Sequence, residues 1–274
     1  MQRFLLGLLV FTYPLVGWAE DKSVAPFEVK TLKYTGGDYK NEPFQYLVLE
    51  PKNRKPGEKY PLVLFLHGAG ERGDNPAKVL RHFPELMAKP SHRKQFPCFL
   101  VVPQCRDGKQ WVEVPWTDKQ STPLAKEPGV MLDMAMQVLD RSLEEYPIDK
   151  NRVYLTGLSM AGYGSWELAM RRPQLFAALA PICGGADETQ AAKLKNIPIW
   201  AAHGDADTVV PVIRTRRMVE AVKKTGGTIH YVEYPKVGHN SWTPAYTDAK
   251  GLLPWMFQQK RSQEPEAGGQ SSEE

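Results

Sequence analysis

Short apolar segments alternate with segments of helical pattern over most of this 274-residue chain. Eight segments have the length and the β-branched, apolar character of strands: 27–34, 44–49, 62–66, 98–102, 153–156, 178–183, 197–202 and 229–234. The last six are nearly all apolar, as expected when a strand is covered on both faces of a parallel sheet. The first two alternate more between apolar and polar residues, which is typical of antiparallel edge strands.

Five segments between and after the later strands carry apolar residues at helical intervals: 77–88, 130–145, 161–171, 212–224 and 252–261. Two antiparallel strands followed by strand–helix alternation predict a three-layer α/β fold around a mostly parallel, eight-stranded sheet. In such folds ligands bind beyond the carboxyl ends of the strands. We therefore expect the functional side chains at strand ends.

The two ends of the chain differ from this pattern. Residues 1–19 combine Arg3, an apolar stretch too short for a bilayer core, and the small residues Gly17 and Ala19, which together predict a cleaved signal peptide. A retained N-terminal anchor is the alternative. Residues 262–274 lack large apolar side chains and are predicted to be disordered. The folded domain is thus predicted at 20–261, in a secreted or periplasmic protein without stable membrane association.

Composition narrows the function classes. The formal net charge is only +4, and no stripe of basic residues with interleaved aromatic residues is present, so we do not expect nucleic-acid binding. Three cysteines are an odd number, so at least one is unpaired within a monomer. Pairing of Cys98 with Cys105 is disfavoured because an extended strand would hold them too far apart. We expect the cysteines to be small buried hydrophobic residues.

Ser159 lies at the centre of a predicted strand–turn–helix segment, between Gly157 and Gly162. Tight turns of this kind, written G-x-S-x-G, need tiny flanking residues because the serine takes a strained backbone conformation. Here Ala161 stands where the second glycine is usual, which keeps the position small but adds a methyl group. A helix-capping serine would explain Ser159 but not its small neighbours. Ser159 is therefore the predicted nucleophile.

A serine nucleophile needs a base to remove its proton and an acid to orient that base. His239 follows the last predicted strand, whereas the other five histidines lie inside strands, before helices or within them. Of these, His67 and His203 precede glycines at strand ends and are expected to brace loops. Asp205 and Asp207 both follow the seventh predicted strand, and the residues alone leave this choice open. A metal site of His203, the two aspartates and His239 lacks the usual H-E-x-x-H or C-x-x-C spacing.

A glycine-rich bend at 66–73 follows the third predicted strand. Acyl transfer develops an oxyanion that two backbone N–H groups commonly stabilise, one of them from the residue after the nucleophile. The N–H groups of Ala69 and Met160 are the expected pair. A nucleotide-binding loop is excluded because the bend lacks the G-K-[ST] ending.

Five motifs in this order carry a family resemblance: 66–73, 157–166, 181–185, 203–207 and 238–240. With them the chain resembles α/β-hydrolases of the phospholipase/carboxylesterase and polyhydroxybutyrate-depolymerase-like group, some of which are called predicted peptidases. The resemblance covers residues 44–261, and Ala161 is its one departure. It implies a catalytic triad of Ser159, Asp207 and His239, and ester hydrolysis without a cofactor or a metal.

Only 13 residues separate the sixth and seventh predicted strands, too few for a helical cap. An open site suits a small-molecule ester or a bulky, polymer- or sugar-linked one. Trp111 and Trp116 in the irregular segment 105–128, together with Trp242, are candidate substrate contacts, and ordinary packing of these rings is the alternative. A serine peptidase of the same fold and a non-catalytic polysaccharide or polyester binder remain alternative functions. The sequence predicts no oligomeric state.

Overall fold

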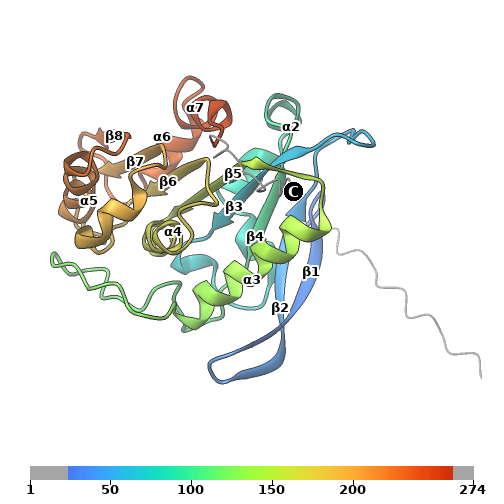
Figure 1. Ribbon diagram of the computed structural model, residues 1–274, viewed down its shortest axis with the longest axis horizontal. Coiled ribbons are helices and arrows are strands. Elements are labelled where there is room, and N and C mark those ends of the chain that lie inside the picture. Colours follow the sequence, from blue (N-terminus) through green and yellow to red (C-terminus); the bar gives the residue numbers. More distant parts are fainter. Residues whose placement is uncertain (1–23, 262–274) are drawn as a thin grey trace, which may run out of the picture.

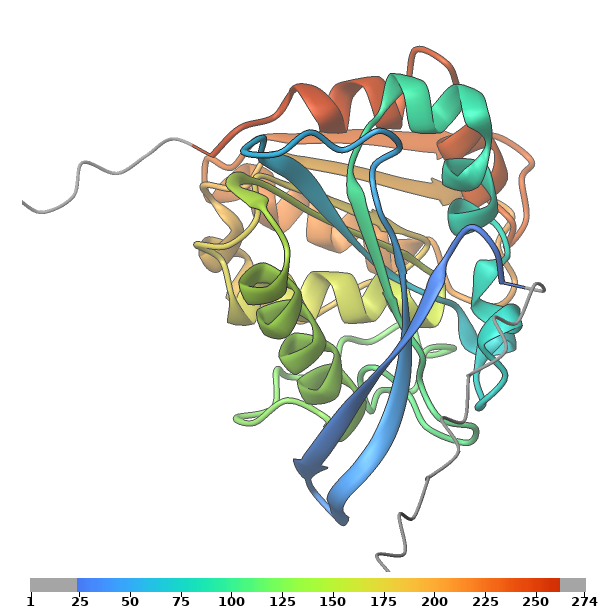
Figure 2. The same cartoon turned by 90° about the vertical axis from the view of Figure 1, so that its right-hand side faces the viewer.

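The computed structural model describes residues 24–261. The predicted signal peptide and the predicted C-terminal tail lie outside the described residues. The described chain contains one eight-stranded sheet with helices on both faces (Figures 1 and 2). This confirms the predicted three-layer, mostly parallel α/β fold, and no separate cap domain is present between residues 24 and 261.

The strands are β1 (Glu28–Gly36), β2 (Tyr39–Leu49), β3 (Tyr60–Leu66), β4 (Phe99–Pro103), β5 (Ile148–Leu158), β6 (Ala178–Ile182), β7 (Ile199–Gly204) and β8 (Ile229–Tyr234). Their order across the sheet is β1-β2-β4-β3-β5-β6-β7-β8. The β1–β2 and β2–β4 pairs are antiparallel, and every later pair is parallel. The carboxyl ends of β3, β5, β6, β7 and β8 therefore share one edge of the sheet.

The helices are α1 (Phe83–Ala88), α2 (Pro90–Gln95), α3 (Val130–Glu145), α4 (Met160–Arg171), α5 (Ile213–Lys224), α6 (Trp242–Thr247) and α7 (Leu252–Gln258), with short 3-10 helices η1 (Ala69–Glu71), η2 (Pro76–Leu80) and η3 (Glu188–Leu194). The predicted helix 77–88 is wrong as one element. His82 has a φ of 65°, which interrupts it and separates η2 from α1. The six-residue helices α2 and α6 were not predicted because so short a segment shows little periodicity.

Two hydrophobic cores lie on the two faces of the sheet. Alternate residues of β3 divide between them, because side chains of a strand point to opposite faces: Leu62 and Leu64 join one core, and Val63 and Phe65 join the other. The first core includes side chains of α3, α4 and α5, and the second includes those of α1, α6 and α7. This double coverage explains why the central strands read as continuous apolar segments.

The structure also bears on the state of the cysteines and on membrane-spanning helices. All three cysteines are buried and free, as predicted. Within residues 24–261, we find no helix with both the length and the apolar character needed to cross a membrane.

Candidate active site

Ser159 forms the tight turn between β5 and α4. Its backbone has a φ of 58° and a ψ of −121°, a conformation that residues with a side chain rarely adopt. A Cβ atom on Gly157 would come 2.7 Å from the carbonyl oxygen of Ala161, and one on Gly162 would collide with the carbonyl of Ile182. Both glycines are therefore needed for the turn. Ala161 itself is fully buried, so its methyl group packs inside the structure.

The three side chains expected as a triad meet at the carboxyl edge of the sheet. Ser159 Oγ lies 2.9 Å from His239 Nε2, and His239 Nδ1 lies 2.7 Å from Asp207 Oδ2. The Asp207 side chain has no exposed surface, while the His239 side chain is 22% exposed. Ser159, Asp207 and His239 follow β5, β7 and β8, respectively. Each therefore lies beyond a strand end, as predicted. The arrangement is one continuous hydrogen-bonded row from hydroxyl to imidazole to carboxylate.

Four donors surround the Asp207 carboxylate. Oδ1 accepts the N–H groups of Val209 at 2.8 Å and Val210 at 2.9 Å, and Oδ2 faces the imidazoles of His239 and His203. Burial alone would raise the pKa of this carboxyl, but the hydrogen bonds from the two imidazoles and the two N–H groups outweigh it. Its pKa is held well below the ordinary value. The group is thus ionised at neutral pH and suited to stabilise an imidazolium.

His203 braces a loop, as predicted. This loop follows β7 and carries Asp207. His203 Nε2 lies 3.1 Å from Asp207 Oδ2 and 3.0 Å from the carbonyl of Val210. Its Nδ1 lies 2.7 Å from the hydroxyl of Thr215, which donates to the carbonyl of Gly184. The direct contact with the carboxylate was not predicted. The only sequence signal for this contact is the place of His203, a polar residue at the end of an apolar strand and just before the two aspartates.

The sequence left Asp205 as an alternative acid and a metal site as an alternative use of these side chains. Asp205 Oδ1 accepts the N–H of Lys236 at 2.6 Å, whereas the carboxylate that His239 contacts is that of Asp207. Donor atoms of Cys183, Asp207 and His239 lie within 4.8 Å of one another. However, two ligands of a tetrahedral zinc ion are about 3.3 Å apart, and the 2.7 Å between Asp207 and His239 is a hydrogen-bond distance. The geometry fits proton transfer better than metal ligation.

The two N–H groups expected to stabilise the oxyanion both belong to the first residue of a helix. Ala69 is the first residue of η1, and Met160 is the first residue of α4. First-turn N–H groups have no acceptor within their own helix, and none of the hydrogen bonds in the described chain uses these two. They are therefore free to donate to a ligand, and their role stays a prediction.

Trp111 is a packing residue, contrary to its prediction as a substrate contact. Its side chain has no exposed surface, and its indole N–H donates to the carbonyl of His67 at 2.9 Å. His67 in turn donates from Nδ1 to the carbonyl of Gly68 and accepts the N–H of Cys105 at Nε2. Burial lowers the pKa of His67 to about 4. Trp111 thus packs inside the structure and supports the glycine-rich bend, with its polar N–H engaged by the protein itself.

The other two tryptophans differ from Trp111. The half-buried Trp242 ring packs edge-to-face on His239, with ring centroids 5.2 Å apart. Trp116 is half-buried and packs against the first core, while its carbonyl accepts the hydroxyl of Tyr163. Trp242 therefore lies beside the expected base, as predicted. Substrate contact remains a prediction for both rings.

Comparisons with known proteins agree with this geometry. A family model described as phospholipase/carboxylesterase matches residues 50–254. The chain belongs to this family. The resemblance predicted from the five motifs is thereby confirmed, and with it membership of a group of α/β-hydrolase enzymes.

The chain spans less than two thirds of the length of the first two relatives described here. A solved thermostable esterase is 38% identical with a TM-score of 0.78, and the match covers 86% of this chain and 63% of that protein. The bifunctional acetylxylan esterase/xylanase XynS20E of Neocallimastix patriciarum is 37% identical over 75 residues, which is 27% of this chain but only 11% of that protein. A ferulic acid esterase structure, 17% identical with a TM-score of 0.61, covers 84% of this chain and 97% of its own. This last likeness shows the fold alone.

Proposed function

We propose that this protein is a serine carboxylic-ester hydrolase that works through an acyl-enzyme. The observation that carries the proposal is the row of contacts from Ser159 through His239 to Asp207, at 2.9 Å and 2.7 Å. These distances lie in the range needed for proton transfer between a nucleophile and its base. Membership of the carboxylesterase family and the similarity to a thermostable esterase support the same reaction.

Each residue has a defined step in the proposed reaction. His239 Nε2 takes the proton of Ser159 as its Oγ attacks the ester carbonyl, and Asp207 stabilises the imidazolium that forms. The N–H groups of Ala69 and Met160 stabilise the oxyanion of the tetrahedral intermediate. When this intermediate collapses, His239 gives its proton to the leaving alcohol and the acyl group stays on Ser159. A water molecule, deprotonated by His239, then releases the acid.

The absence of a cap between residues 24 and 261 supports an open-site ester substrate, including polymer- or sugar-linked ones. The connection between β6 and β7 contains only η3. An ester is favoured over a peptide because an alkoxide leaves with less help from the base than an amine does. Export from the cytoplasm is proposed on the sequence of residues 1–19 alone.

The direct test compares the purified protein with two serine variants on p-nitrophenyl acetate and butyrate. We expect Ser159→Ala to lower kcat by about 10⁴-fold or more. Ser165 provides the matched control, because its hydroxyl lies on the same helix, is buried and has no hydrogen-bond partner. Ser165→Ala should retain activity. Equal activity of the protein and Ser159→Ala would refute the proposal, and faster cleavage of the matching p-nitroanilides would favour a peptidase.

A further inference from the structure

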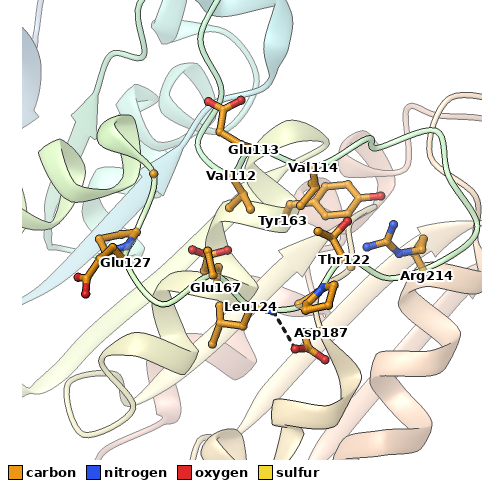
Figure 3. A pocket seen from close by; sticks show the side chains of 16 residues that line it. Val112, Glu113, Val114, Thr122, Leu124, Glu127, Tyr163, Glu167, Asp187 and Arg214 are labelled. Carbon is orange, nitrogen blue, oxygen red and sulfur yellow. Dashed lines mark hydrogen bonds between the residues drawn. The ribbon is translucent and has the colours of Figure 1, made fainter. Parts of the chain in front are cut away.

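A pocket of about 180 Å³ lies beneath the irregular segment 112–129 (Figure 3). Its lining includes Tyr163 of α4, which follows Ser159 by four residues, or about 6 Å of helix. It also includes Gly185, two residues after Cys183, whose sulfur lies within 4.8 Å of donor atoms of the acid and the base. The pocket therefore begins about one helical turn from the proposed nucleophile.

Arg214 is the only basic residue in this lining, and it is 1% exposed. Its Nη1 donates to the carbonyls of Asp118 at 3.1 Å and Gln120 at 2.8 Å, and its guanidinium lies 5.1 Å from the centroid of the Tyr163 ring. In the part of the chain that the structure describes, it forms no salt bridge with a carboxylate. A buried charge of this kind normally has a counter-charge, because removing it from water is costly.

One edge of the guanidinium has no acceptor. Nε is buried without a hydrogen-bond partner, and Nη2 donates to no group in residues 24–261. The Nε–Nη2 edge presents two parallel donors, the arrangement that a carboxylate accepts through both of its oxygens. A Cβ atom on Gly185 would come 3.2 Å from Nε and 2.8 Å from the Arg214 Cβ. Only a glycine keeps this side of the arginine uncrowded.

The acidic residues of the lining do not neutralise this cation. Glu167 pairs with Arg171. Asp187 accepts the N–H groups of Thr189 in η3 and of Leu124, the second of which is drawn in Figure 3. Glu113 and Glu127 are exposed and lie away from the guanidinium, which points toward Thr122 and the Tyr163 ring (Figure 3). The pocket thus has a buried cation, and its two exposed carboxylates, of Glu113 and Glu127, lie away from it.

We propose that this pocket is a subsite for a free carboxylate carried by the ester substrate. The inference rests on the proposed ester hydrolysis and adds the substrate class: esters whose acyl or alcohol part bears a carboxylate, in preference to neutral esters of similar shape. The carboxylate binds side-on to Nε and Nη2 of Arg214. Hydroxyl groups elsewhere on the substrate can donate to the exposed carboxylates across the pocket.

The first experiment measures kcat and KM for two matched pairs of esters. Mono-p-nitrophenyl glutarate and p-nitrophenyl butyrate differ in an acyl carboxylate, while 4-acetoxybutyrate and butyl acetate differ in an alcohol carboxylate. We expect one pair to show at least a tenfold preference in kcat/KM for the charged member, mainly through a lower KM. Preferences within twofold in both pairs would overturn the subsite and leave the esterase intact. Failure to hydrolyse any ester would instead overturn the proposed function.

The second experiment assigns the preference to Arg214. Arg214→Met should reduce it to within about twofold. Because Arg214 also holds the loop, Arg217→Met is the matched control: Arg217 donates to the carbonyl of Lys119 and to the side chain of Gln120 in the same segment. That variant should keep the preference. The assignment would be contradicted if both variants lost the preference for the charged ester, or if both kept it.

A binding measurement on Ser159→Ala keeps the proposal testable if Arg214→Met does not fold or if no ester is turned over. We expect glutarate to bind at least tenfold more tightly than glutaramide, by isothermal titration calorimetry at moderate salt. The two ligands have the same length, but glutaramide is uncharged because an amide replaces each carboxylate. Equal affinities would overturn the subsite.

Discussion

His203 and His239 share one oxygen of the same carboxylate: Asp207 Oδ2 lies 3.1 Å from His203 Nε2 and 2.7 Å from His239 Nδ1. His203 is completely buried and is held in turn by Thr215. The acid of the proposed triad is therefore held by a second imidazole in addition to its base. His203 acts on the reaction through Asp207, as a positioning residue.

Replacing His203 should affect turnover more than substrate binding. We expect His203→Phe to lower kcat by about 10- to 100-fold with little change in KM, because Asp207 loses a donor that fixes its orientation. His203→Gln retains an amide donor and should recover part of the loss. Steady-state kinetics with p-nitrophenyl butyrate checks both variants. Unchanged kcat in both, or a change in KM alone, would argue against a positioning role.

The departure at Ala161 should not impair activity. Its methyl group is buried in the first turn of α4, so Ala161→Gly is expected to lower the free energy of unfolding by about 1 kcal/mol and to leave kcat/KM within about twofold. Gly162→Ala is the contrasting variant, since its Cβ would collide with backbone atoms of the loop after β6. It should cost clearly more stability. Denaturation in guanidinium chloride measures both, and a large rise in kcat/KM for Ala161→Gly would contradict this view.

His67 should make stability fall in mild acid. Its pKa is about 4 in the folded chain and near the ordinary 6.5 when unfolded. Between these values only the unfolded chain takes up a proton here, so stability is lost as pH falls from 6.5 and levels off near 4. The loss amounts to about 3 kcal/mol.

Unfolding free energies at pH 7, 5.5 and 4 test this expectation. The unmodified protein should lose more stability than His67→Gln over this range. His230→Gln, which replaces an exposed imidazole, serves as the control and should keep the full pH dependence. Identical pH dependence in the protein and His67→Gln would show that His67 does not contribute.

Arg171 should hold the wall of the substrate pocket in place. It donates to three consecutive carbonyls at 125–127. Arg171→Met is therefore expected to increase trypsin cleavage within 112–129 several-fold, read by mass spectrometry. Its neighbour Arg172 pairs with Asp140 on α3 instead, so Arg172→Met should leave cleavage of this segment unchanged. Equal cleavage of the two variants would contradict the anchoring.

The strand and helix pattern was predictable because strands that are buried on both faces of the sheet consist almost entirely of apolar residues. The helix at 130–145 has the predicted bounds, since three full turns of apolar periodicity define it. The interruption at His82 was not predictable, because a positive φ at a histidine depends on the surrounding chain. The position of β4 between β2 and β3 likewise depends on long-range pairing that no local pattern reports.

The meeting of the three side chains of the proposed triad was predictable because each follows a strand, and parallel strands end at one edge. The supporting contacts were not. The sequence left Trp111 as either a substrate contact or a packing residue, and only the inward fold of its loop, which buries it, decides for packing. Arg214 is one of several basic residues within the predicted helix 212–224. Only its burial without a counter-charge distinguishes it from Arg216 and Arg217, and burial of a single long side chain leaves no periodic signal.

Covalent labelling of the protein with a fluorophosphonate tests the central claim most directly. Reaction requires a serine activated by a nearby base, so mass spectrometry of the digested protein should place a single label on Ser159. Labelling should disappear in Ser159→Ala and become at least 100-fold slower in His239→Ala. An unlabelled protein, or a label on another serine, would contradict the account.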